Sequence, residues 1–289
     1  MSAHIPAKKS LGQHFLNDES VLRRIAALSA PEPGSGIVEV GPGTGNLTAH
    51  LLALGAPVVT VERDRRMLEV LAQRFGAELP VVEADAAQID WHALLTRPEL
   101  GPRPVVAGNL PYYAAMPILF AVLESKPLPA RIIIMVQREV ADRILGKPST
   151  PEYGQISVKI QRIANVRLGL RVGRGAFSPP PKVESAVLVL EPLAVPHEPV
   201  PDDARFSAFV SAGFAQRRKT LTNSLESVLG LAPALTRAGL EQLHIDVRVR
   251  GEALSVKQWA ALAWVLDAEI VAASAAKALP GAGLPARSA

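Results

Sequence analysis

The sequence predicts an α/β protein with a doubly wound, mostly parallel sheet, followed by a small all-helical domain. Three observations support this prediction. Short β-branched runs alternate with amphipathic helical patterns in the first half of the chain, a glycine-rich turn follows the first of these runs, and the pattern becomes helical after a proline-rich segment. With 289 residues, 48% of them hydrophobic, the chain has enough apolar material for a large core domain and a smaller second one.

Five short runs have the composition of buried strands, and each ends in a polar or glycine-bearing turn. Segments with helical spacing of apolar residues separate them. This order is typical of a doubly wound parallel sheet. The expected strands are residues 37–40, 57–62, 80–85, 104–109 and 131–137, and the expected helices are residues 47–54, 65–75 and 117–123.

Beyond Asp142 the alternation stops. Two further strand-like runs, residues 157–172 and 183–190, are expected to extend the sheet at one edge with an antiparallel strand, before a proline-rich linker over residues 191–203. The predicted domains are a sheet domain over residues 1–194 that includes an N-terminal arm (1–20), a helical domain over residues 204–274, and a flexible tail over residues 275–289.

Composition excludes several kinds of site. The chain has no cysteine, which rules out disulfides, thiolate–zinc sites, iron–sulfur clusters and a cysteine nucleophile. Its six histidines show no metal-ligand spacing, so we expect no metal. Residues 1–10 lack the apolar run of a signal peptide, and charges interrupt the most apolar segment near the C-terminus. We therefore expect a cytoplasmic protein without a membrane span.

Charge is distributed unevenly along the chain. Residues 1–130 contain 11 Lys and Arg against 13 Asp and Glu, whereas residues 131–289 contain 20 against 14. A basic region on a near-neutral protein is compatible with a polyanionic partner. It is equally compatible with a solvated surface, so charge alone leaves both interpretations open.

A glycine-rich loop, EVGPGTG, lies between the first expected strand and a helix. Its glycines, Gly41, Gly43 and Gly45, permit positive φ and close approach of a ligand to the backbone. A dinucleotide site prefers G-x-G-x-x-G, but here the third glycine comes one residue earlier and an acidic residue precedes the loop. The spacing resembles the loop of S-adenosylmethionine-dependent methyltransferases, which packs against the amino-acid and ribose portion of the cofactor.

Two acids follow at the ends of successive expected strands. Glu62 could accept hydrogen bonds from both ribose hydroxyls, and Asp85 could accept one from the exocyclic amine of the cofactor's adenine. Carboxylates also occupy such turns as ordinary caps. Because the carboxyl ends of parallel strands share one edge of a sheet, the two acids beside the glycine loop favour a binding role.

The motif Asn109-Leu-Pro-Tyr112 follows the fourth expected strand. The exocyclic amine of a base is a poor nucleophile because its lone pair is delocalised into the ring. The Asn109 side-chain oxygen and the Leu110 carbonyl could accept the amine hydrogens and direct the lone pair at a methyl group. Pro111 fixes the turn, and Tyr112 offers a ring on which the base can stack. The alternative is an ordinary Asn-x-Pro turn with a half-buried tyrosine.

Five segments together resemble the ribosomal RNA adenine dimethyltransferases that modify small-subunit RNA and are associated with kasugamycin sensitivity. The first three are also shared with a sister family that methylates large-subunit RNA and confers macrolide resistance, whereas the last two are more similar to the small-subunit enzymes. The segments are KKSLGQHFLND (8–18), EVGPGTGNLT (39–48), NLPY (109–112), FSPPPKVES (177–185) and FAQRRKTLTNSL (214–225).

This resemblance implies S-adenosylmethionine as the cofactor and a role for each matching residue. The family usually continues its Asn-Leu-Pro-Tyr motif with Asn, Ile and Ser or Thr, where this chain has Tyr113, Ala114 and Ala115. The family positions that line the cofactor correspond to His14, Leu16 and Gly41. The position that binds the ribose corresponds to Glu62, and the position that binds the cofactor's adenine corresponds to Asp85. The positions that hold the target base correspond to Asn109 and Tyr112.

The two later motifs fit an RNA-binding enzyme. Phe177 and Lys182 flank a stiff proline run that could form a wall beside a flipped base, and the same run could also be a rigid turn packed on the core. Arg217, Arg218 and Lys219 form a basic run expected to open a helix and to contact phosphates, with a solvated face as the alternative.

The resemblance implies a monomeric enzyme that transfers two methyl groups to the N6 amine of each of two adjacent adenosines near the 3′ end of small-subunit rRNA, acting on an assembling small subunit. The sheet domain would bind the cofactor and the helical domain the ribosomal RNA. Three alternatives remain: a large-subunit methyltransferase of the resistance type, a non-catalytic ribosome-assembly or nucleic-acid-binding factor, and a dinucleotide oxidoreductase.

Overall fold

The computed structural model describes residues 14–271. The chain folds into two compact units. Within the described residues, the sheet unit comprises 14–141 together with 164–194, and the helical unit comprises 142–163 together with 195–271. The change of unit after residue 194 lies where the sequence pattern placed the end of the sheet domain. Residues 142–163, which the same pattern assigned to the sheet domain, belong instead to the helical unit.

A seven-stranded sheet organises the sheet unit, with strand order β4-β3-β2-β5-β6-β9-β7. Its first five strands pair in parallel, whereas β9 is antiparallel to both β6 and β7. The α/β Rossmann-like prediction is confirmed. The strands are β2 (Ile37–Val40), β3 (Val58–Glu62), β4 (Val81–Glu83), β5 (Val105–Asn109), β6 (Arg131–Gln137), β7 (Ala164–Val172) and β9 (Ser185–Pro192).

One expected strand is partly wrong. Residues 157–163 belong to helix α7 (Gln155–Ile163), and strand β7 begins only at Ala164. Apolar side chains at Ile156, Val158 and Ile160 alternate as in a strand, but Ile156, Ile160 and Ile163 also fit one face of a helix. The segment is helical in the structure, where Val158 and Ile160 are both fully buried and Val158 packs in the core of the helical unit.

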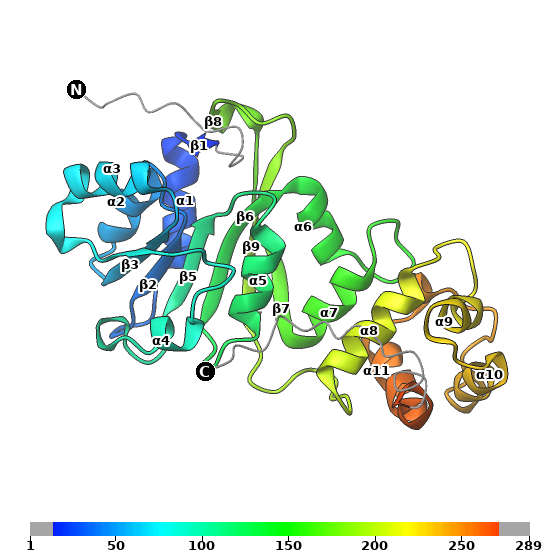
Figure 1. Cartoon of the computed structure of the whole chain (residues 1–289). Coiled ribbons are helices and arrows are strands. Elements are labelled where there is room, and N and C mark those ends of the chain that lie inside the picture. The colour runs from blue at the N-terminus through cyan, green and yellow to red at the C-terminus, as the bar shows by residue number, and fades with distance from the viewer. Residues whose placement is uncertain (1–13, 272–289) are drawn as a thin grey trace. The chain divides into compact units, whose positions relative to one another are not determined.

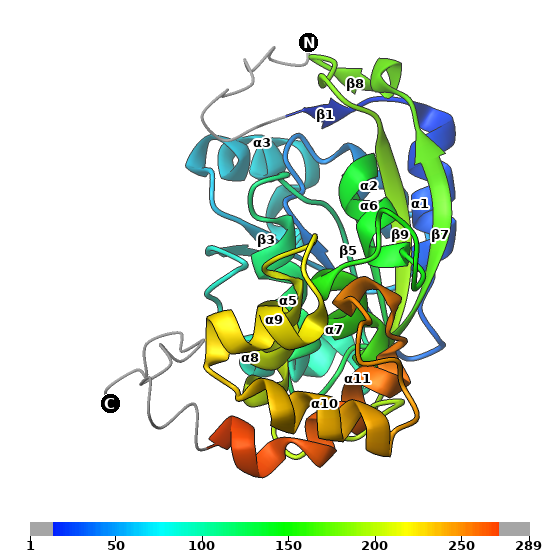
Figure 2. The ribbon, with the colours of Figure 1, turned by 90° about the vertical axis from the view of Figure 1, so that its right-hand side faces the viewer.

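Helices cover both faces of the sheet, and Figures 1 and 2 place α1 on one face and α5 on the other. Leu22 of α1, Leu51 of α2 and Leu71 of α3 join one core cluster with strand residues. The sheet unit's helices are α1 (Glu19–Ser29), α2 (Asn46–Leu52), α3 (Arg65–Phe75), α4 (Trp91–Leu95) and α5 (Ala115–Leu123); α6 (Arg138–Leu145) crosses the unit boundary, and short 3-10 turns are Gly76–Glu78, Pro98–Leu100 and Arg174–Ala176.

A second, two-stranded sheet joins the arm to a distant loop. Strand β1 (Phe15–Leu16) pairs antiparallel with β8 (Phe177–Ser178), with Leu16 opposite Phe177. The two strands lie together at the top of Figure 1. Asn17 extends the pairing by donating its backbone N–H to the Ala176 carbonyl at 2.8 Å. The expected arm over residues 1–20 is thus described from His14 onward, and residues 1–13 lie outside the described part.

The helical unit is held by an aromatic core. Phe209 and Trp259 make an edge-to-face contact with ring centroids 5.5 Å apart, and the Tyr153 hydroxyl donates to the Leu254 carbonyl at 2.8 Å. Tyr153 explains why residues 142–163 belong here, since its side chain is buried in this core. Besides α7, the elements are α8 (Asp203–Phe214), α9 (Leu221–Leu229), α10 (Pro233–Gln242), the turn Gly251–Ala253 and α11 (Val256–Val265). The expected tail, residues 275–289, lies outside the described residues.

Within residues 14–271 no helix combines the length and the apolar run that a bilayer crossing requires.

Candidate active site

A pocket lies at the carboxyl ends of β2, β3 and β5, the edge at which doubly wound sheets bind ligands. The arm, the glycine loop and the segment after β5 all line it. Gly45, Asp85 and the residues of the two later motifs do not. The expected site residues that line the pocket are His14, Leu16, Gly41, Gly43, Glu62, Asn109, Leu110, Pro111 and Tyr112.

The glycine loop requires its glycines for two different reasons. Gly45 has φ +80°, and a Cβ there would lie 2.4 Å from the Phe75 ring of α3, so a side chain would separate the loop from that helix. Gly43 has φ +55° and faces the Phe15 ring, with 3.3 Å between an added Cβ and that ring. The loop is therefore compressed between α3 and the arm.

Glu62 is held at the end of β3 by three backbone amides. Its Oε1 accepts from the N–H groups of Arg63 and Asp64, both at 2.8 Å, and its Oε2 accepts from Gly43 at 3.2 Å. Burial raises the pKa of the Glu62 carboxyl, while these amides act in the opposite direction. The expected ribose acceptor is thus oriented by the glycine loop itself.

Glu39 is a second carboxyl in the pocket, at the end of β2, and it is 1% exposed. The pKa of the Glu39 carboxyl is raised to about 8. Burial is the main cause and the charge of Glu62 adds to it, while the nearby Thr48 hydroxyl acts in the opposite direction. Glu39 Oε2 has no hydrogen-bond partner among the described residues. A buried oxygen without a partner beside a pocket indicates a polar ligand, because such groups are otherwise satisfied within the protein. Glu39 had no separate expected role.

Asp85 lies outside the pocket lining and is bound by other residues. Its Oδ2 accepts from Arg63 Nη1 at 3.0 Å, and its Oδ1 accepts from the Ala87 N–H at 3.0 Å. The same Arg63 nitrogen lies 3.4 Å from the Tyr113 hydroxyl. Arg63 and Tyr113 both line the pocket and had no expected role. Their contact could not be foreseen, since it joins residues 50 positions apart.

The Asn-Leu-Pro-Tyr motif forms a tight turn after β5. The Pro111 carbonyl accepts from the Ala114 N–H at 2.9 Å, and Leu110 is buried. The Asn109 side chain donates through Nδ2 to the His14 carbonyl at 3.2 Å. The Tyr112 hydroxyl is 2.8 Å from the Ser185 hydroxyl on β9, and burial raises the pKa of this phenol.

The three residues that depart from the family pattern have different environments. Tyr113 is 53% exposed, whereas Ala114 and Ala115 are buried and lead into α5. Where the family usually has Asn, Ile and Ser or Thr, this chain therefore presents one exposed phenol and two buried methyl groups.

The residues of the later motifs are not among those that line the pocket. Phe177 is 5% exposed and belongs to the apolar core of the sheet unit, which agrees with the rigid-turn alternative, and Lys182 is exposed. Arg217, Arg218 and Lys219 are exposed in a turn between α8 and α9, so the expectation that they open a helix is wrong. Thr220 caps α9 instead: its side chain accepts from the Asn223 N–H, a position that Ser and Thr favour.

No group of three or more His, Asp or Glu side chains arranged to hold a metal ion occurs within residues 14–271.

Comparison with known proteins identifies the family. The model of the ribosomal RNA adenine dimethylase family matches residues 5–267. The chain belongs to this family. Ribosomal RNA small subunit methyltransferase A of Anaeromyxobacter sp. (strain K) is 46% identical over 262 residues, covering 89% of this chain and 92% of that protein. The protein of the same name from Geobacter sulfurreducens is 41% identical over 261 residues, covering 89% and 94%.

Solved structures show the fold of this adenine dimethylase family. A dimethyladenosine transferase from Plasmodium falciparum matches with a TM-score of 0.72 at 23% identity, over 89% of this chain and 98% of that one. The 23S rRNA methyltransferase ErmE matches with a TM-score of 0.65 at 25% identity, over 88% and 99%. The expected resemblance to rRNA adenine dimethyltransferases is confirmed.

Proposed function

We propose that this protein is an S-adenosylmethionine-dependent enzyme that dimethylates the N6 amine of two adjacent adenosines near the 3′ end of small-subunit rRNA. The observation that carries the proposal is one pocket in which the Asn109–Tyr112 motif faces the glycine loop and Glu62, in a chain of the rRNA adenine dimethylase family. The relatives named small subunit methyltransferase A support the choice of substrate.

The pocket fits S-adenosylmethionine. Gly41 and Gly43 let the cofactor approach the backbone, Glu62 presents an oriented carboxylate to the ribose hydroxyls, and the unpartnered oxygen of Glu39 is available to a polar group of the cofactor. Arg63 would form the wall on the adenine side and hold Asp85 there. When bound, the cofactor supplies a methyl group that its sulfonium already activates.

The remaining catalytic task is to present the target amine. Because the Asn109 amide nitrogen donates to the His14 carbonyl, its oxygen is left to accept one amine hydrogen, and the Leu110 carbonyl accepts the other. Tyr112 stacks on the base. The proton released from the alkylated amine passes to Asn109 Oδ1 or to water. Positioning of this kind contributes roughly 7 to 11 kcal/mol, so no separate general base is needed.

The exposed Arg217, Arg218 and Lys219 would contact rRNA phosphates, which position the RNA without reading its sequence. An assembling small ribosomal subunit in the cytoplasm is the proposed substrate particle, and a monomer is the proposed active form.

The test is incubation with labelled S-adenosylmethionine and under-methylated small subunits, large subunits or free RNA, followed by mass spectrometry of the nucleosides. Dimethyladenosine from small subunits alone, lost in Asn109→Ala, is expected. Label in large-subunit RNA would favour the resistance-type alternative. Ribosome binding without transfer would favour an assembly factor.

A further inference from the structure

His14 touches both parts of the acceptor motif. Its backbone carbonyl accepts from Asn109 Nδ2 at 3.2 Å, and its ring lies 6.0 Å from the Tyr112 ring, centroid to centroid, at an interplanar angle of 29°. The ring is anchored in turn, because Nδ1 donates to the Pro179 carbonyl at 2.8 Å. A single residue of the arm therefore contacts the two side chains that would hold the target adenine.

The carbonyl of His14 determines which way the Asn109 amide points. A carbonyl oxygen only accepts hydrogen bonds, so the amide must turn its nitrogen toward His14 and its oxygen away from it. In that orientation Asn109 is an acceptor for an amine. The opposite orientation would place two donors, the amide NH₂ and the target amine, against each other. The position of His14 thus sets the polarity that the proposed reaction needs.

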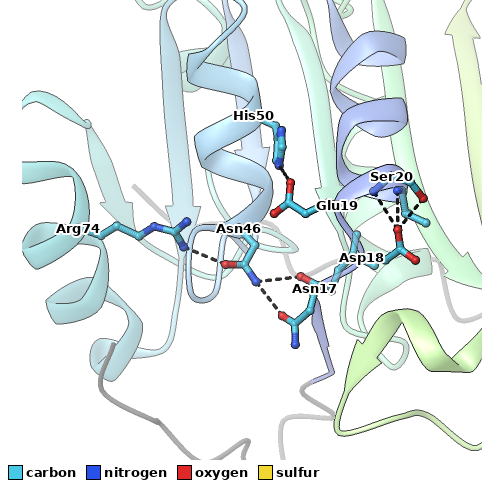
Figure 3. A network of polar contacts seen from close by, with 9 residues as sticks. Asn17, Asp18, Glu19, Ser20, Asn46, His50 and Arg74 are labelled. Carbon is cyan, nitrogen blue, oxygen red and sulfur yellow. Dashed lines mark hydrogen bonds and ion pairs between the residues drawn. The ribbon is translucent and has the colours of Figure 1, made fainter. Parts of the chain in front are cut away.

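A polar clasp holds the arm just beyond His14. Asn46, the first residue of α2, donates through Nδ2 to the Leu16 carbonyl at 2.9 Å and to Asn17 Oδ1 at 2.8 Å. Its own oxygen accepts from Arg74 Nη1 at 2.9 Å, and the same nitrogen donates to the Thr44 carbonyl at 2.7 Å. Figure 3 shows this line of contacts from Arg74 of α3 through Asn46 to Asn17.

We propose that this Asn46–Arg74 clasp positions the acceptor site: it holds Leu16 and Asn17 so that the His14 carbonyl keeps the Asn109 amide oxygen available to the target amine. Asn46 and Arg74 are then positioning residues: Asn46 also lines the pocket, but both act on the target amine through the arm and not by contacting it. The inference rests on the proposed function and deepens it. It concerns the acceptor side of the pocket, where the clasp acts through His14 and Asn109.

The substitution Asn46→Asp tests the clasp with almost no change in volume. The carboxylate keeps an oxygen for Arg74 but places its other oxygen against two acceptors, the Leu16 carbonyl and Asn17 Oδ1. Arg74→Met is a second variant that removes the contact from the opposite side. Gln73→Ala is the matched control, because it changes an exposed neighbour on α3.

Two measurements decide the outcome. Hydrogen exchange of the backbone amides of residues 15–18 in the protein without cofactor is expected to become about tenfold faster in both clasp variants. Methyl transfer to small subunits at saturating cofactor is expected to lose about tenfold in kcat with little change in the KM for RNA. Gln73→Ala is expected to match the wild type in both measurements.

Unchanged hydrogen exchange of residues 15–18 in both variants would show that the clasp does not hold the arm. Faster exchange with unchanged kcat would overturn the link from the arm to Asn109. A purely structural role would lower the thermal midpoint but leave kcat per folded molecule unchanged, which also counts against the proposal. If the wild type itself transferred no methyl group to small subunits, the proposed function would fail, and the exchange measurement distinguishes that result from a failure of the clasp.

Discussion

The two acids proposed to bind the ribose and the adenine of the cofactor, Glu62 and Asp85, are held differently. Glu62 is 7% exposed, lines the pocket and accepts from three backbone amides. The Asp85 side chain is 31% exposed, accepts from one backbone amide, that of Ala87, and pairs through its other oxygen with the side chain of Arg63. Backbone amides belong to the fold and cannot move away, whereas an exposed arginine can. Glu62, the proposed ribose acceptor, is therefore preorganised, whereas one oxygen of Asp85, the proposed adenine acceptor, depends on a movable partner.

The largest expected effect is at Glu62, the proposed ribose acceptor. Glu62→Ala removes the carboxylate and leaves the Gly43, Arg63 and Asp64 amides without their acceptor. Hydrogen bonds to charged groups contribute about 1.5 to 3 kcal/mol each, so we expect the affinity for S-adenosylmethionine to fall by about 100-fold. Isothermal calorimetry measures this. Glu69→Ala, at an exposed position of α3, is the control. Equal affinities of the two variants for the cofactor would show that Glu62 is not the stronger of the two proposed binding acids.

The buried carboxyl of Glu39, which also lines the pocket, makes the stability of the folded protein depend on pH. Its pKa in the folded protein, about 8, lies above the ordinary value of 4.5. Between these values the unfolded chain ionises while the folded protein keeps its proton, so stability falls as pH rises from about 4.5 to 8. We expect Glu39→Gln to remove most of this loss, which is about 3.5 kcal/mol between pH 5 and pH 8.

Urea unfolding of the cofactor-free protein at the two pH values measures the effect. Parallel pH profiles for the wild type and Glu39→Gln would contradict the prediction.

At Asp85, the proposed adenine acceptor, the expected effect is smaller, and two substitutions separate its causes. Asp85→Ala removes the acceptor and should weaken cofactor binding about tenfold, whereas Asp85→Asn keeps an oxygen and should weaken it less. If Asp85→Ala bound the cofactor as tightly as the wild type, Asp85 would serve Arg63 alone. The same calorimetric titration compares both variants.

The smallest expected effect is the coupling between Arg63 and Asp85. Their contact is partly exposed, with 47% and 31% of the two side chains accessible. Exposed ion pairs typically contribute 0.2 to 1 kcal/mol, so a double-mutant cycle with Arg63→Leu and Asp85→Ala should give a coupling of about 0.5 kcal/mol in unfolding free energy. A value above about 2 kcal/mol would show that Asp85 is held as rigidly as Glu62.

The sequence predicts most accurately what burial and local spacing determine. The strands at residues 37–40 and 131–137 begin and end where expected, because β-branched runs buried in a parallel sheet leave little ambiguity. The α7 segment was misassigned because its apolar residues satisfy two periods, and only the buried contact with the helical unit decides between them.

In the candidate site, too, local spacing was predictable from the sequence and long-range contacts were not. Residues next to the glycine loop were found because motif spacing is local. Arg63, Tyr113 and the Asn46 clasp were not found, since each contact joins residues 22 to 50 positions apart and depends on which elements become neighbours in space. For Phe177 the sequence left two interpretations open, a wall beside the base and a rigid turn on the core, and the observed burial where it pairs with the arm agrees with the second.

The pairing of β1 with β8 has a consequence for the order of folding. His14 and Pro179 are 165 positions apart, and their hydrogen bond ties the pocket-lining His14 to the segment that follows β8. A ribosome synthesising this chain exposes the arm long before it makes residues 177–179, so the five parallel strands can assemble while the arm still lacks its β partner. The segment of the pocket that is translated first is therefore the last to be completed.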